Sequence, residues 1–127
     1  MNIQKVDLTG RRVLVVEDEV LVSMLVEDML ADIGCIVVGP APRVDIAVQM
    51  ASNEEIDAAF LDVNLAGVRV FPVADVLAER GIPFIFVSGY GDQATIDQPH
   101  QGRPIIQKPF VPEALEEALL ACLSEAS

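Results

Sequence analysis

The sequence has little cysteine, little histidine and no long apolar run. Its 127 residues include two cysteines, Cys35 and Cys122, and one histidine. Two cysteines so far apart form neither a disulfide framework nor a CxxC metal site, so we expect two reduced, buried thiols. No apolar run reaches the roughly 20 residues that cross a bilayer, and the N-terminus has no signal-peptide pattern. We therefore expect a cytoplasmic protein with no membrane partner.

Basic residues are also scarce. Eight Lys and Arg against twenty Asp and Glu give a net charge of −12. Such a field repels phosphate backbones, which excludes direct nucleic-acid binding as the expected function. With 52% hydrophobic residues the chain has enough apolar material for one core. We expect one domain over residues 10–124, after a short leader at 1–9.

Two kinds of segment alternate along the chain. Short apolar, β-prone runs without internal alternation are typical of strands covered on both faces. They lie at 12–16, 36–38, 58–61, 84–87 and 104–107. Helical spacing of apolar residues separates them, at 22–33, 44–51, 73–77 and 111–122, and is weak at 91–102. The alternation predicts a doubly wound α/β fold, with a five-stranded parallel sheet and helices on both faces.

Polar residues follow the ends of these expected strands. Glu17 and Asp18 follow the first strand, Asp62 the third, Ser88 the fourth and Lys108 the fifth. In a parallel sheet the carboxyl ends of the strands share one edge, where functional groups gather. We therefore expect three acids, one hydroxyl and one ammonium to converge there.

Three converging carboxylates indicate a cation site. Like charges raise one another's pKa unless a cation lies between them. Carboxylate oxygens are hard ligands, and no thiol or imidazole is near in the sequence, which favours Mg²⁺. Mg²⁺ and Lys108 together would stabilise the charge of a transferring phosphoryl group. Asp62 is the best-placed carboxylate nucleophile and would form an aspartyl phosphate.

Four motifs, in this order and spacing, resemble the receiver domain of bacterial response regulators, the CheY-like family. They are VLVVEDE at 13–19, FLDVNLAG at 60–67, FVSGYG at 86–91 and QKPF at 107–110. The resemblance implies a flavodoxin-like fold with strand order 2-1-3-4-5. The stretch PFIFVSGYG at 83–91 is similar to the "FAT GUY" subgroup of single-domain receivers, with Val87-Ser88 in place of its usual Ala-Thr.

The resemblance also implies roles for the acidic residues. Asp62 matches the phosphoacceptor of the family. Glu17 and Asp18 match the pair that holds Mg²⁺, directly or through water. Asp62 and the backbone carbonyl of Asn64 would complete the protein ligands.

A second group of residues matches the parts of the family that respond to phosphorylation. Lys108 would contact the acceptor carboxylate and then the phosphoryl group, and its bond to Pro109 would be cis. Ser88 would turn its hydroxyl toward the phosphoryl oxygen. Many receivers carry Tyr or Phe three residues before this Lys, where the chain has Ile105. Tyr90 is the nearest aromatic substitute, and the polar stretch 91–102 is a second candidate switch.

The resemblance implies partners as well. A phosphohistidine on a sensor histidine kinase or a phosphotransfer protein would donate the phosphoryl group, and the sequence DVNL is similar to receivers paired with HWE-type kinases. Phosphotransfer and slow autodephosphorylation would both act on the protein itself, so we expect no enzyme with a separate substrate. We expect a stand-alone regulator, with a fragment of a longer regulator as the alternative.

Two other functions stay open at this point. A receiver-like module could bind a partner protein without phosphorylation. A phosphotransferase of the haloacid-dehalogenase type also uses Asp, Mg²⁺, a hydroxyl and Lys. That chemistry wants a second Asp two residues after the nucleophile, where this chain has Asn64.

For two further residues we favour ordinary structural roles. Glu19 suits the first turn of a helix, where the macrodipole favours negative charge. His100 stands in a polar stretch with no second ligand nearby, so we expect it to be solvent-exposed.

Overall fold

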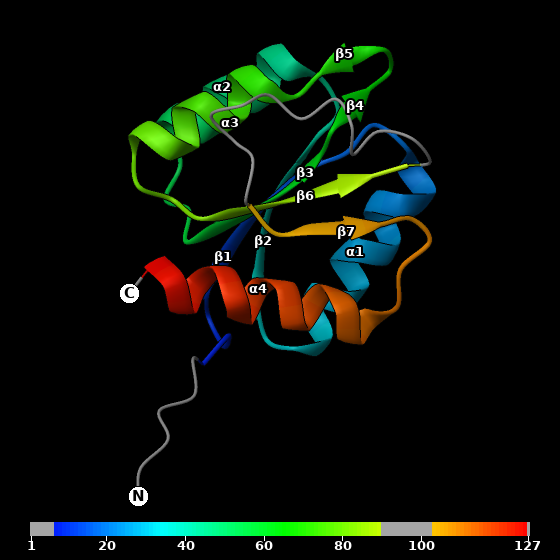
Figure 1. Cartoon of the computed structure of the whole chain (residues 1–127), viewed down its shortest axis with the longest axis vertical. Helices are drawn as coiled ribbons and strands as arrows, with labels where there is room; N and C mark the ends of the chain where they lie inside the picture. The colour runs from blue at the N-terminus through cyan, green and yellow to red at the C-terminus, as the bar shows by residue number, and fades with distance from the viewer. Residues whose placement is uncertain (1–6, 90–102, 127) are drawn as a thin grey trace, which may run out of the picture.

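The computed structural model of the chain describes residues 7–89 and 103–126. Its central sheet has five parallel strands in the order β2-β1-β3-β6-β7 (Figure 1). The strands are β1 (Arg12–Val16), β2 (Ile36–Ala41), β3 (Ala58–Asp62), β6 (Phe84–Ser88) and β7 (Ile105–Gln107). Because β6 and β7 are the fourth and fifth strands of this sheet, the predicted order 2-1-3-4-5 is confirmed.

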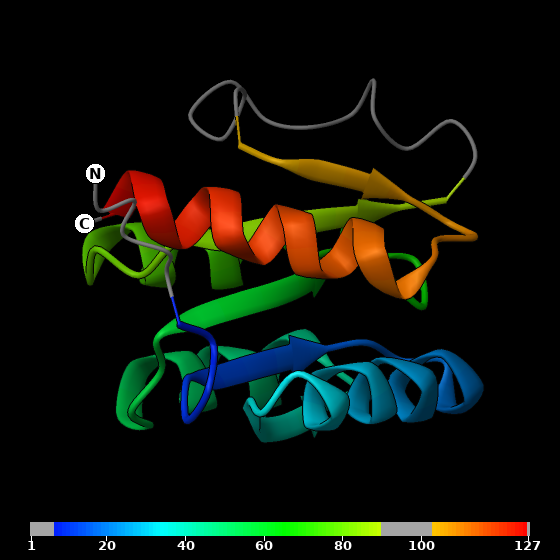
Figure 2. The same ribbon diagram turned by 90° about the horizontal axis from the view of Figure 1, so that it is seen from below.

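Helices cover both faces of the sheet, as predicted. They are α1 (Val20–Asp32), α2 (Val44–Asn53), α3 (Phe71–Glu79) and α4 (Pro112–Ala126). Figures 1 and 2 show α1 and α4 on one face, and α2 and α3 on the other. Within the described ranges, no helix is long and apolar enough to cross a bilayer. The expectations for Tyr90, 91–102 and His100 lie outside the described residues.

The strands contribute side chains to two hydrophobic cores, one on each face of the sheet. Along β1, Val13 and Val15 join the cluster with α1 and α4, while Leu14 and Val16 join the cluster with α2 and α3. Successive side chains of a strand point to opposite faces, so both sets must be apolar. Every residue of β3 and β6 is buried, as expected for central strands. Burying each large apolar side chain contributes about 1.5–3 kcal/mol.

Both cysteines lie in the core beside α1 and α4. Both are buried, as expected, and among the described residues neither is in a disulfide. The Cys35 Sγ lies 3.5 Å from the carbonyl oxygen of Leu8, to which it donates. Leu8 is itself buried in the same core. The chain thus packs against the domain before the first strand begins.

A short hairpin that the sequence analysis did not predict follows β3. Its strands β4 (Asn64–Leu65) and β5 (Val68–Arg69) pair antiparallel across a turn at Ala66 and Gly67. Both turn residues have positive φ, 50° and 89°. That conformation matches a type I′ turn, which suits the twist of a hairpin. The Asn64 Oδ1 accepts a hydrogen bond of 2.8 Å from the Gly67 N–H and closes the turn.

Candidate functional site

Three acidic side chains meet at the carboxyl edge of the sheet. Asp62 is the last residue of β3, and Glu17 and Asp18 directly follow β1. One carboxylate oxygen from each of the three lies within 4.8 Å of the others. Glu17 is 2% exposed and Asp62 is 3% exposed. The structure therefore brings together the three acids that the sequence analysis selected.

Lys108 reaches into this cluster from the end of β7. Its Nζ lies 3.0 Å from Asp62 Oδ2, 3.1 Å from Glu17 Oε1 and 3.0 Å from Glu19 Oε1. Its backbone N–H donates a 2.9 Å hydrogen bond to the Ser88 carbonyl, which continues the pairing of β6 with β7. The Lys108-Pro109 bond is cis, as the resemblance implied.

The charges at the site are unbalanced. Burial, together with the nearby Asp62, raises the pKa of Glu17 from 4.5 to about 7. Burial works against the charge of Lys108, but its contacts with the Glu19, Asp62 and Glu17 carboxyl groups outweigh that effect and raise its pKa. Lys108 therefore stays charged at neutral pH, and Glu17 holds a proton up to about pH 7 in the absence of a further cation.

Ser88 is the last residue of β6 and is 0% exposed. Its Oγ has no hydrogen-bond partner among the described residues. A buried hydroxyl without a partner costs free energy and calls for an explanation. A group that binds at this edge and accepts a hydrogen bond would supply one.

Asn64 lies beside the acceptor strand but keeps its side chain away from the cluster. Its backbone N–H donates a 3.1 Å hydrogen bond to Asp62 Oδ1, while its side chain holds the hairpin turn. The bond to Oδ1 and the Lys108 contact to Oδ2 fix both oxygens of Asp62. The role of the Asn64 carbonyl as a metal ligand stays a prediction.

Glu19 belongs to this site, which the sequence analysis missed. It occupies the N-cap position of α1 and makes no side-chain capping bond, so the expected first-turn role is wrong. Its carboxylate contacts Lys108, and its N–H donates a 3.1 Å hydrogen bond to Glu17 Oε2. The signal was its position directly after the acidic pair, at the same edge as Lys108.

An apolar hollow adjoins the site. It has a volume of about 400 Å³. Glu19 and Lys108 form its polar side, and the rest is lined by Val22, Leu25, Gly89, Pro109 and Phe110. The neighbouring first turns of α1 expose Leu21 at 82% and Met24 at 55%. Lys108 and Glu19 thus lie between the acidic cluster and an apolar surface.

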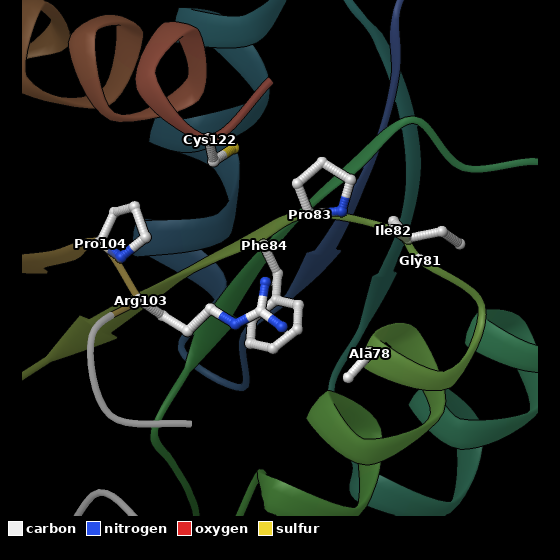
Figure 3. A pocket seen from close by; sticks show the side chains of 8 residues that line it. All are labelled: Ala78, Gly81, Ile82, Pro83, Phe84, Arg103, Pro104 and Cys122. Carbon is white, nitrogen blue, oxygen red and sulfur yellow. The ribbon is translucent and has the colours of Figure 1, made fainter. Parts of the chain in front are cut away.

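A second, smaller cavity lies at the amino ends of β6 and β7 (Figure 3). It has a volume of about 180 Å³ and is lined mainly by apolar side chains. The Arg103 guanidinium lies 4.3 Å from the centre of the Phe84 ring at its edge. None of the predicted site residues lines this cavity. The predicted site residues that the structure describes lie instead at the opposite, carboxyl edge.

The donor set of the acidic cluster suits a small, hard cation. Its ligand atoms are three carboxylate oxygens, two of them on buried residues, with no soft ligand among them. Such a set is typical of a Mg²⁺ site that leaves positions for water and phosphate oxygens. Burial and the nearby Asp62 raise the pKa of Glu17, and a cation bound between the carboxylates would oppose that effect.

The sequence profile of the response regulator receiver domain matches residues 13–120. The chain belongs to this family. As a receiver domain it is a CheY-like component of two-component signalling. The comparison with curated protein sequences gave no match.

Solved receiver domains have the same fold. SdrG from Sphingomonas melonis Fr1 is 41% identical, with a TM-score of 0.81 over 90% of this chain and 97% of that one. A receiver protein from Sinorhizobium medicae WSM419 is 23% identical, with a TM-score of 0.82 over 93% and 98%. The receiver domain of the sensor kinase PA1611 from Pseudomonas aeruginosa PAO1 is 22% identical, with a TM-score of 0.78 over 91% and 99%, and holds magnesium in its active-site cleft.

Proposed function

We propose that this receiver domain, over residues 10–124, accepts a phosphoryl group on Asp62 and signals by phosphorylation-dependent binding of a partner protein. The protein acts in the cytoplasm, and the donor is a phosphohistidine of a sensor histidine kinase or phosphotransfer protein. The observation that carries the proposal is the position of Lys108, with Nζ 3.0 Å from Asp62 Oδ2 inside the acidic cluster. A nucleophilic carboxylate and a fixed cation then face the same incoming group.

We further propose that Glu17, Asp18, Asp62 and the backbone carbonyl of Asn64 hold Mg²⁺. When bound, the ion supplies positive charge to the phosphoryl oxygens. The three carboxylate oxygens within 4.8 Å support this assignment. The magnesium in the related Pseudomonas receiver domain supports it as well.

In the transfer step, one oxygen of Asp62 forms a bond to phosphorus while the bond from phosphorus to the donor imidazole breaks. The imidazole leaves with the electron pair. Lys108 donates a hydrogen bond to a phosphoryl oxygen, and Ser88 Oγ gains the acceptor that it lacks among the described residues. Water later attacks phosphorus, the bond from phosphorus to the Asp62 oxygen breaks, and inorganic phosphate leaves from the restored Asp62 carboxylate. Both steps act on the domain itself, so it is no multiple-turnover enzyme.

The readout of phosphorylation differs from that of many receivers. Ile105, at the position of the usual aromatic residue, is 40% exposed at the start of β7. We propose that Ser88 and Tyr90 carry the switch, within the motif at 83–91 that resembles the "FAT GUY" subgroup. An HWE-type kinase stays our predicted donor, because the sequence DVNL is similar to receivers paired with such kinases.

Intact-mass spectrometry tests the proposal directly. The protein is incubated with acetyl phosphate and Mg²⁺, alongside Asp62→Asn and the matched exposed variant Asp28→Asn. We expect wild type and Asp28→Asn to gain one phosphoryl group and Asp62→Asn to gain none. A wild type that neither gains a phosphoryl group nor binds beryllofluoride would support the alternative, a module that acts without phosphorylation.

A further inference from the structure

The Lys108 ammonium lies among three carboxylates and donates hydrogen bonds to two of them, Asp62 and Glu19. An ammonium carries three N–H groups. Its Nζ contacts Asp62 Oδ2 at 3.0 Å, Glu19 Oε1 at 3.0 Å and Glu17 Oε1 at 3.1 Å. Glu17 Oε1 has no hydrogen-bond partner among the described residues, so the hydrogen bonds of the ammonium go to Asp62 and Glu19. A phosphoryl oxygen that binds Lys108 therefore competes with these two carboxylates for the ammonium.

The three contacts differ in how easily they can be released. The side chains of Glu17 and Asp62 are 0% and 4% exposed, whereas that of Glu19 is 61% exposed. Separating the buried Asp62 carboxylate from its cation would leave a charge that water cannot solvate, which is costly. An exposed carboxylate regains its hydration, and exposed ion pairs contribute little to stability. We therefore expect the Lys108–Glu19 contact to be the one that breaks when a phosphoryl oxygen binds Lys108.

The place of Glu19 in the fold fits such a release. Its backbone is held at the site by the hydrogen bond from its N–H to Glu17 Oε2. Its side chain makes no capping bond to α1, so moving it away from Lys108 breaks no helix contact. Glu19 also lines the apolar hollow beside Lys108, where a bound molecule would meet its carboxylate.

We propose that Glu19 is a positioning residue that holds Lys108 in the resting site and slows phosphoryl transfer until it releases the ammonium. This inference rests on the proposed function of Asp62. The exchange makes and breaks no covalent bond to Glu19, because an N–H···O contact to its carboxylate is replaced by one to a phosphoryl oxygen. Its exposed charge lies on the solvent side of the two buried carboxylates and repels the incoming anion.

The test compares Glu19→Gln with wild type and with Asp28→Asn, which removes the same charge. Asp28 is exposed, and it lies nine residues along the chain from Glu19, roughly 13 Å on a helical rise. Phosphorylation by acetyl phosphate with Mg²⁺ is followed by intact mass at low salt and at high salt. Beryllofluoride affinity is measured by fluorine NMR, and the thermal unfolding of each variant is recorded.

For Glu19→Gln we expect roughly three- to tenfold faster phosphorylation at low salt, tighter beryllofluoride binding and an unchanged melting temperature. The gain should shrink at high salt because the repulsion is screened. Asp28→Asn should match wild type. A Glu19→Gln rate equal to that of Asp28→Asn, or slower, would overturn the inference while the phosphorylated wild type upheld the proposed function. A wild type without phosphorylation would overturn both.

Discussion

Ionisation of the buried Glu17 carboxyl lowers the stability of the fold, so the free energy of unfolding depends on pH. Its pKa is about 7 in the folded protein, against 4.5 for the free group. Between these values the folded state binds more protons than the unfolded state, so stability must fall as pH rises. The full effect of this one group is about 3 kcal/mol at most.

We therefore expect the free energy of unfolding in EDTA to decrease from pH 5 to pH 8 in wild type. Glu17→Gln, which cannot titrate, should lose less stability over the same range. Urea denaturation at the two pH values measures both. Parallel losses in the two proteins would show that Glu17 does not titrate in this range.

Substitution of Ser88 should change ligand binding without lowering the stability of the fold. Its hydroxyl is buried without a partner among the described residues, so Ser88→Ala removes no hydrogen bond seen there. We expect the melting temperature to stay the same or rise slightly. Beryllofluoride binding should weaken about tenfold, the value of one charge-assisted hydrogen bond. Fluorine NMR and thermal unfolding measure the two effects.

Ser23→Ala is the matched control for that variant. Ser23 is also buried, but it lies in α1 and its Oγ bonds to the Val20 carbonyl at 3.1 Å. Its substitution should leave beryllofluoride binding unchanged. A loss of binding as large as that of Ser88→Ala would contradict a direct contact between the Ser88 hydroxyl and the bound group.

At the scale of elements, the hairpin after β3 positions Asn64 beside Asp62. Its turn has Ala66 at φ 50°, where an L-residue is strained, and Gly67 at φ 89°. We expect Gly67→Ala to lower the free energy of unfolding by about 1 kcal/mol, although the added Cβ meets nothing within 4 Å. Ala66→Gly should raise it by up to about 1 kcal/mol. Changes of opposite sign in the free energy of unfolding of the two variants, measured by urea denaturation, would confirm the turn. Changes of the same sign would contradict it.

The hairpin also shows why parts of the fold were not predictable from the sequence. The long elements have an apolar pattern that repeats over several residues, and the structure contains them at nearly the predicted positions. β4 and β5 have two residues each, too few for any period, and Ala66 is no signal for a turn with positive φ. β2 extends to Ala41, past the predicted end, through a Gly-Pro pair that usually ends a strand.

The candidate site, too, was predictable from the sequence only in part. Parallel strands place their ends together, so the topology alone was enough to bring Glu17, Asp62 and Lys108 to one edge. The contact of Glu19 with Lys108 depends on where a long side chain turns at the start of α1. Sequence spacing places its backbone but leaves its side-chain rotamer open.

At the scale of the whole molecule, excess negative charge should make the fold respond to cations in two distinguishable ways. The chain carries a net charge of −12, so any salt weakens its self-repulsion. The cluster of Glu17, Asp18 and Asp62 adds a specific response, because an ion that binds only the folded state stabilises it by mass action. At ten times its dissociation constant that term is about 1.4 kcal/mol, or roughly 5 °C in melting temperature.

We expect MgCl₂ to raise the melting temperature more than NaCl of equal ionic strength. The difference should disappear in Asp18→Asn, which removes one carboxylate of the cluster but changes the net charge by a single unit. Differential scanning calorimetry with both salts measures the two responses on one sample. Equal shifts from MgCl₂ and NaCl in wild type would mean that the acids act only through the total charge. A surplus for MgCl₂ that Asp18→Asn removes would show that their arrangement at the sheet edge binds the ion.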